Sequence, residues 1–162
     1  MRSRVAAILP DYTGYWTQTF HAACYRILRM DIHNLGFDRN FTIVDDADAG
    51  AVIKEILKEE NDYETKPEHL LHVFKQVKNS QDDPEKYFAR LKMPFESKEK
   101  KLQIYKQYNR RLKELNALDF EDLIVLCIKL FNEYPEVLHK YQNRFRYIMI
   151  DEYQDTNFAQ YQ

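Results

Sequence analysis

The sequence predicts an α/β fold that is mostly helical, with an α/β layer and a helical insertion. Apolar residues recur at intervals of three and four over most of the chain, which is the pattern of amphipathic helices. Continuous apolar runs of strand length are few, and the clearest is Tyr147–Ile150. Only three glycines occur, and 31% of residues are charged, which favours long surface helices over glycine-rich loops.

The composition limits the classes of protein that remain possible. With 162 residues and 44% hydrophobic content, the chain can build one ordinary domain or parts of two. The net charge of -2 gives no overall basic signature, so any nucleic-acid site must be local. Cys24 and Cys127 lie within apolar helical patterns and are expected to be buried, reduced thiols. Because no apolar run approaches the roughly 18 residues of a membrane span, we expect a cytoplasmic protein without membrane contact.

The first third of the chain predicts strands followed by helices. We expect the end of a helix at Arg2–Leu9 and a β-prone strand at Tyr15–Thr19. A helix follows over residues 20–35, and Gly36 stands where a left-handed cap belongs. Phe41–Val44 is then expected to be extended.

Helices dominate the middle of the chain. Asp45 or Asp46 is expected to cap a helix that runs to Leu57. Pro67 and Pro84 suit the first turns of two further helices. A long helix over Ser97–Leu115 has a basic side, but glutamates lie among its lysines, so a solvated helix with paired charges is favoured over a duplex-DNA contact.

The last part combines a buried helix with a strand that ends in acids. Asp119 is the expected N-cap of a largely buried helix, and a short helix follows Pro135. The buried strand Tyr147–Ile150 ends at Asp151 and Glu152. Such a strand is how ATPases place carboxylates beside a magnesium nucleotide, although an isolated Asp-Glu pair is more often a solvated acidic turn.

A longer string of residues around this pair resembles a known family. Residues 151–157 (Asp-Glu-Tyr-Gln-Asp-Thr-Asn), followed by Ala-Gln-Tyr at 159–161, resemble motif II of UvrD/Rep-type superfamily 1 DNA helicases. Residues 19–21 with 27–29, residues 41–45 and residues 117–123 resemble other segments of that family, in the same order. The resemblance implies part of a P-loop, RecA-like parallel-sheet domain, called 1A, at residues 1–66 and 142–162, with a helical 1B insertion at residues 67–141.

The same resemblance implies a function for individual residues. Asp151 would hold Mg²⁺ through water, Glu152 would be the catalytic base for ATP hydrolysis, and Gln154 would couple nucleotide state to neighbouring motifs. Thr19, Phe20 and His21 would contact single-stranded DNA, where an aromatic ring can stack on any base. The alternatives are that Phe20 anchors the core and that His21 only makes structural hydrogen bonds. The implied activity is 3′ to 5′ translocation on single strands and unwinding at junctions with duplex DNA.

The sequence departs from the family pattern at the phosphate-binding loop. No glycine-rich segment ends in Gly-Lys-Ser or Gly-Lys-Thr, so we expect that the chain alone does not hydrolyse ATP. Two other functions stay open at this point. One is a stand-alone DNA-binding or regulatory module derived from a helicase. The other is a metal-dependent nuclease that uses Asp151, Glu152 and Asp155 directly.

Overall fold

A computed structural model describes residue 7 and residues 16–161, without the side chain of Asp155. The helix expected over Arg2–Leu9 therefore lies, apart from Ala7, outside the described residues. The described elements are, in order, α2 (Phe20–Asp31), the 3-10 helix η1 (Ile32–Leu35), β1 (Thr42–Ile43), α3 (Asp46–Glu59), α4 (Pro67–Ser80), α5 (Pro84–Arg90), α6 (Phe95–Glu114), β2 (Ala117–Leu118), α7 (Asp122–Glu133), α8 (Pro135–Arg144), the 3-10 helix η2 (Tyr153–Asp155) and α9 (Phe158–Tyr161).

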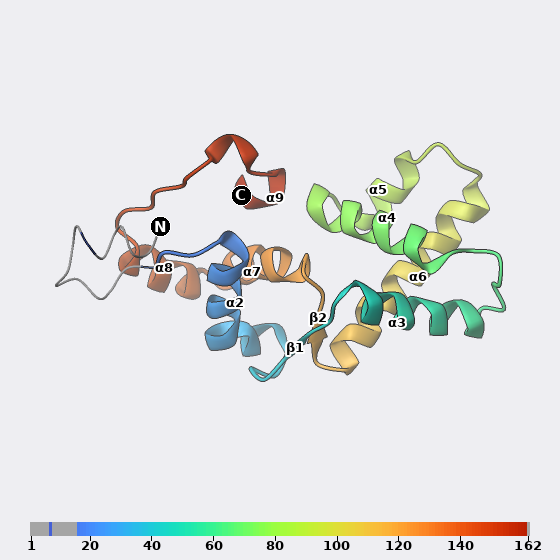
Figure 1. Cartoon of the computed structure of the whole chain (residues 1–162), viewed down its shortest axis with the longest axis horizontal. Coiled ribbons are helices and arrows are strands. Elements are labelled where there is room, and N and C mark those ends of the chain that lie inside the picture. Colours follow the sequence, from blue (N-terminus) through green and yellow to red (C-terminus); the bar gives the residue numbers. More distant parts are fainter. Residues whose placement is uncertain (1–6, 8–15, 162) are drawn as a thin grey trace.

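These elements form two lobes that meet at a small sheet (Figure 1). Helices α3 to α6 make one lobe, and α2, α7 and α8 make the other. Strands β1 and β2 pair in parallel at the junction, with Thr42 opposite Ala117 and Ile43 opposite Leu118. The expected class, α/β and mostly helical, is confirmed.

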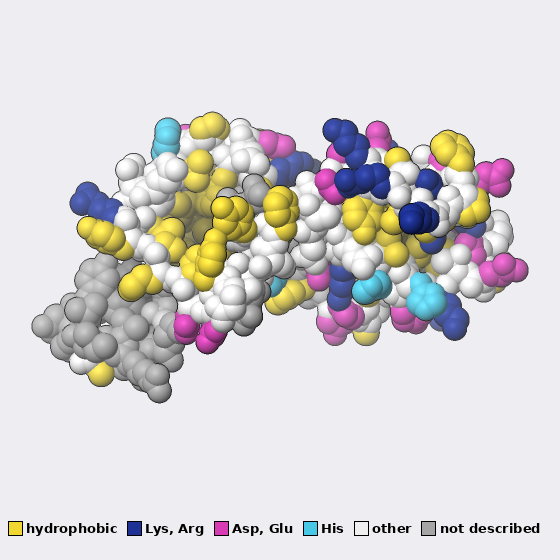
Figure 2. Space-filling view, turned by 90° about the horizontal axis from the view of Figure 1, so that it is seen from above, with side chains coloured by type: hydrophobic (Ala, Val, Ile, Leu, Met, Phe, Trp, Pro, Cys, Tyr) yellow, Lys and Arg dark blue, Asp and Glu magenta, His cyan; other side chains and the backbone are white. Residues whose placement is uncertain are grey.

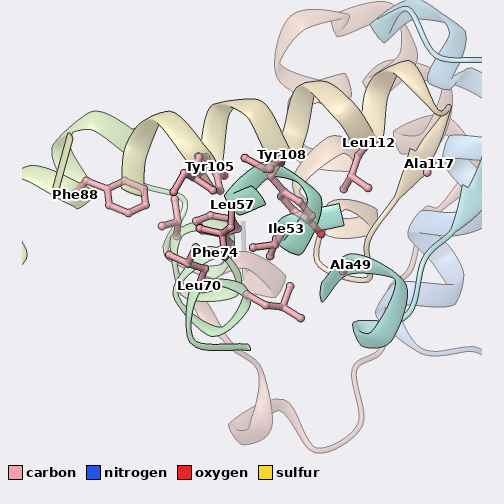
Figure 3. Close-up of a cluster of buried hydrophobic side chains, with 14 residues drawn as sticks. Ala49, Ile53, Leu57, Leu70, Phe74, Phe88, Tyr105, Tyr108, Leu112 and Ala117 are labelled. Atoms are coloured by element: carbon pink, nitrogen blue, oxygen red, sulfur yellow. The ribbon is translucent and has the colours of Figure 1, made fainter. Parts of the chain in front are cut away.

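Each lobe has its own hydrophobic core. In the first lobe, α3, α4 and α6 pack around Phe74 and Tyr108, and Phe88 of α5 closes one end (Figure 3). In the second lobe, Leu28 of α2 packs with residues of α7 and α8, among them Leu130. Burial of side chains of this size stabilises a fold by roughly 1.5–3 kcal/mol each, so either core can support its lobe.

Several expected helix ends are confirmed, and their geometry explains them. The Asp45 carboxylate accepts hydrogen bonds from the backbone N–H groups of Ala47 and Asp48, both at 2.9 Å, and thereby caps α3. Gly36 has φ of 75°, a left-handed conformation that costs glycine little, and it ends η1. Pro67 and Pro84 occupy first turns, where a missing backbone N–H is tolerated.

Two of the expected strands, Tyr15–Thr19 and Tyr147–Ile150, do not form within the described residues, so these two predictions are wrong. Trp16–Thr19 is not a strand; Trp16 packs against Tyr141 and Phe145, and Thr19 is already the N-cap of α2. Tyr147–Ile150 is also unpaired, and Tyr147 is 92% exposed. A strand needs a hydrogen-bonding neighbour, and the only sheet in the described part of the chain is β1 with β2.

Helix α7 begins later than expected, at Asp122, with Glu121 as its N-cap. Asp119 instead precedes a tight turn, and Phe120 is exposed on that turn rather than buried in a helix. Helix α3 shares a core with α4 to α6. The expected domain boundaries at residues 66/67 and 141/142 stay predictions. Among residues 16–161, no helix has both the length and the apolar character needed to cross a bilayer.

Candidate functional site

The predicted DNA-contacting residues lie at the start of α2. Thr19 is the N-cap of this helix, and its hydroxyl accepts a hydrogen bond from the backbone N–H of Ala22 at 3.3 Å. Phe20 and His21, the first two helical residues, are both half-buried. Thr19 therefore has a structural role whether or not it contacts DNA.

His21 stacks on an aromatic residue that is distant in the sequence. Its ring lies 3.9 Å, centroid to centroid, from the ring of Phe120, and the two planes differ by 18°. Phe120 is 51% exposed, so part of the pair faces solvent. Burial lowers the pKa of His21. The pair forms an aromatic surface, partly open to solvent, that can stack on a further flat ring.

A shallow groove of about 500 Å³ borders this aromatic pair. It is lined by Phe120, by Ile43 and Val44 at the end of β1, and by residues 45–47 at the start of α3. Asp46 pairs with Lys75 at 2.6 Å, and the Asp45 carboxylate caps α3, so both charges at this end of the groove already have partners. The rest of the lining consists of apolar side chains: Ile43, Val44, Ala47 and Phe120.

Several of the basic side chains of α6 form ion pairs. Lys106 contacts Glu85 at 2.7 Å, Arg110 contacts Glu114 at 2.8 Å, and Arg111 contacts Glu59 at 2.6 Å. Basic and acidic side chains are interspersed over this lobe in Figure 2. The arrangement supports the solvated helix with paired charges.

The predicted nucleotide-binding acids lie on the exposed segment that leads to α9. Asp151, Glu152 and Gln154 are all exposed. The backbone N–H of Glu152 donates to Asp151 Oδ1 at 3.1 Å, and the amide of Gln154 donates to Glu152 Oε2. Glu152 has φ of 50°, a left-handed conformation uncommon for residues other than glycine, so the two carboxylates do not extend from a regular strand.

The chemistry of these side chains fits a magnesium ion, because Mg²⁺ prefers carboxylate oxygens and water. Asp151 and Glu152 are the residues that could hold it. A cluster of three metal-binding side chains does not occur among the side chains that the structure describes, which exclude that of Asp155.

The two predicted sites have no direct polar contact within the described residues. No hydrogen bond or ion pair there joins residues 19–21 to residues 151–154. Hydrophobic side chains surround a hollow on the α2–α7–α8 lobe (Figure 2), and Tyr147, Ile148 and Met149 are exposed.

A buried ionic cluster lies beside Phe120, and the sequence patterns do not predict it. Lys78 of α4, only 4% exposed, contacts Asp119 at 2.6 Å and Asp122 at 2.7 Å, and Tyr108 of α6 donates to Asp119 at 2.9 Å. Burial lowers the pKa of Lys78, but the carboxylates of Asp122 and Asp119 outweigh it and raise the pKa above its ordinary value. Burial raises the pKa of Asp122 to about 6. One signal was available: Lys78 follows Phe74 by four residues and so falls on the apolar face of its helix.

Comparisons with known proteins cover the whole chain. The profile of the UvrD/REP helicase N-terminal domain matches residues 1–162. The ATP-dependent DNA helicase PcrA of Bacillus subtilis is 44% identical over 164 aligned residues, which are 99% of this chain and 22% of that protein. The proteins of the same name from Staphylococcus aureus strain Mu50 and Staphylococcus epidermidis are 42% and 44% identical, with the same coverage.

Proposed function

The chain belongs to the UvrD/Rep helicase family, and from this premise we propose that it is part of an ATP-dependent DNA helicase. It spans about a fifth of the length of the curated relatives that it matches. The proposal is carried by one observation: the family match extends over the whole chain and includes the acidic motif at residues 151–157. The intact enzyme would move 3′ to 5′ on single strands and unwind duplex DNA at junctions, in repair or replication in the cytoplasm.

In this proposal Asp151 and Glu152 serve ATP hydrolysis. Asp151 would hold Mg²⁺, and Glu152 would accept the proton of the attacking water. Bound magnesium supplies charge neutralisation at the phosphates. Gln154, which donates to Glu152, senses the position of that carboxylate and couples it to neighbouring motifs.

The DNA surface is proposed to consist of Thr19, Phe20 and His21, joined by Phe120. The stacked pair offers a flat face to bases of any sequence, which suits a motor that must not depend on sequence. The apolar lining of the adjacent groove supports the same assignment, because it favours base rings over phosphate. Residues 1–66 and 142–162 are proposed to form the 1A part, and residues 67–141 the 1B insertion.

We further propose that the chain alone does not hydrolyse ATP. Positioning of the phosphates contributes as much to phosphoryl transfer as a base does, and no Gly-Lys-Ser or Gly-Lys-Thr occurs in the sequence. A chimera tests both proposals, namely that the chain is part of an ATP-dependent DNA helicase and that the chain alone does not hydrolyse ATP. This chain replaces the matching segment of the Bacillus subtilis relative, and ATP turnover is measured with and without single-stranded DNA. We expect DNA-stimulated turnover in the chimera and none in the chain alone.

The unaltered relative is the positive control for this experiment. A folded chimera that binds single-stranded DNA and ATP but shows no stimulated turnover would point to a DNA-binding module without catalysis. DNA cleavage by the chain alone with Mg²⁺ would instead support the nuclease.

A further inference from the structure

The turn that presents Phe120 is closed by two acidic residues on either side of it. The backbone N–H of Asp122 donates to Asp119 Oδ1 at 2.9 Å, and the backbone N–H of Asp119 donates to Asp122 Oδ2 at 3.2 Å. These reciprocal bonds fix the backbone on both sides of Phe120. Both carboxylates are buried, whereas the ring between them is half exposed.

The other lobe holds this turn through two buried side chains, Lys78 and Tyr108. Lys78, near the end of α4, contacts Asp119 Oδ2 and Asp122 Oδ1, so its ammonium joins both ends of the turn. Tyr108 of α6 donates to the same oxygen of Asp119, and the Lys78 ammonium lies 5.3 Å from its ring centre. The oxygens that face away from Lys78 accept the backbone bonds. Each carboxylate thus uses one oxygen to pair with Lys78 and the other to accept a backbone hydrogen bond within the turn.

We infer that Lys78 is a positioning residue, which holds the turn of residues 119–122 so that Phe120 stacks on His21. The ion pairs transmit the placement of α4 to an aromatic ring on the other lobe. A buried carboxylate pair without its cation is unstable because of desolvation and mutual repulsion. Loss of Lys78 therefore opens the turn, and Phe120 leaves the imidazole ring. The use of this ring in DNA binding rests on the proposed function, but its placement by Lys78 does not.

The pKa of His21 measures the placement of Phe120 without DNA. Burial holds this pKa below the ordinary histidine value, and the stacked Phe120 covers one face of the ring. The pKa is obtained by NMR titration of the histidine ring protons in the full chain, with His21→Gln used to assign the signal. Lys78→Met is compared with Phe120→Ala and with Lys106→Met, a control in the same lobe whose partner is the exposed Glu85.

We expect Lys78→Met and Phe120→Ala to raise the pKa of His21 toward the ordinary value, and Lys106→Met to leave it unchanged. A role in stability alone would lower the urea midpoint of Lys78→Met and leave the pKa of His21 in the folded chain as in the wild type. That result overturns the inference. If Lys78→Met does not fold, Lys78→Met/Asp122→Asn is used, because it removes one charge of each sign.

Single-stranded DNA binding then separates the inference from the proposed function. With a fluorescent oligothymidylate, Phe120→Ala is expected to weaken binding roughly 5- to 150-fold, and Lys78→Met to add little in the double variant. Unchanged binding in Phe120→Ala would contradict the role of Phe120 in the proposed DNA surface. The pKa of His21 would then be the test of whether Lys78 positions Phe120. Independent, multiplicative losses in the two variants would show that Lys78 does not act through Phe120.

Discussion

The phenolic oxygen of Tyr141 donates a hydrogen bond of 2.7 Å to Asp31 Oδ2 and so ties α8 to the end of α2. Lys140 contacts the same carboxylate at 2.8 Å. Burial raises the pKa of Asp31, but the hydrogen bonds from Lys140 and Tyr141 outweigh it and leave the pKa below its usual value. The contact therefore stabilises the lobe that contains the start of α2, and it does so in a pH-dependent manner.

We expect Tyr141→Phe to lower the free energy of unfolding by about 1.5–3 kcal/mol at pH 7, because it removes a buried bond to a charged group. A carboxyl whose pKa is depressed by folding contributes stability above its unfolded pKa and loses it as pH falls through the folded pKa. The cost of Tyr141→Phe should therefore shrink below about pH 4. Urea unfolding across pH 3 to 7 measures it, and a cost that did not change with pH would contradict this account.

Lys78→Met should destabilise the chain far more than loss of an exposed cation. Removal of one partner from a buried ion pair typically costs about 3–5 kcal/mol, because the remaining carboxylates stay buried. The matched control is Arg110→Met, which loses an exposed pair with Glu114 and should cost at most about 0.5 kcal/mol. Equal unfolding free energies for the two variants would show that the cluster around Lys78 contributes little.

Variants of Thr19 separate its capping role from its proposed contact with DNA. Thr19→Ala should lower the free energy of unfolding by about 0.5–2 kcal/mol, because it leaves the Ala22 amide without its partner. Thr19→Asp retains the cap but adds negative charge. We expect Thr19→Asp to keep its thermal stability and to bind single-stranded DNA more weakly than the wild type does. Wild-type affinity in Thr19→Asp would remove this residue from the DNA surface.

Substitution of Phe20 tests another aromatic side chain of the proposed DNA surface. If Phe20 stacks on a base, Phe20→Ala in the chimera should weaken single-strand binding by roughly 1–3 kcal/mol. Phe95→Ala is the control, since Phe95 is 74% exposed at the start of α6 in the other lobe. Fluorescence anisotropy measures both affinities. Unchanged affinity in Phe20→Ala, together with lower stability, would return Phe20 to the core.

The helices could be predicted from the sequence because their determinants are local. The apolar spacing around Phe74, the Asp45 cap and the left-handed Gly36 all depend on residues within one or two turns of the same helix. Those three features were predicted and are confirmed.

Features that depend on distant residues could not be predicted in this way. The apolar run Tyr147–Ile150 has the composition of a buried strand, but strand formation depends on a hydrogen-bonding neighbour that a local pattern does not specify. Phe120 lies on a turn whose flanking residues, Asp119 and Asp122, pair with Lys78 from another lobe. The stacking of Phe120 on His21 likewise joins two segments that are far apart in the sequence, and no periodic pattern of residues relates them.

Glu152→Gln in the chimera tests the central claim most directly. The amide keeps the shape of the side chain but cannot accept a proton from the attacking water. ATP turnover in the presence of single-stranded DNA is measured beside equilibrium binding of ATP. We predict that turnover is abolished while ATP binding persists. Full turnover in Glu152→Gln, with normal ATP binding, would contradict the assignment of this acid as the catalytic base.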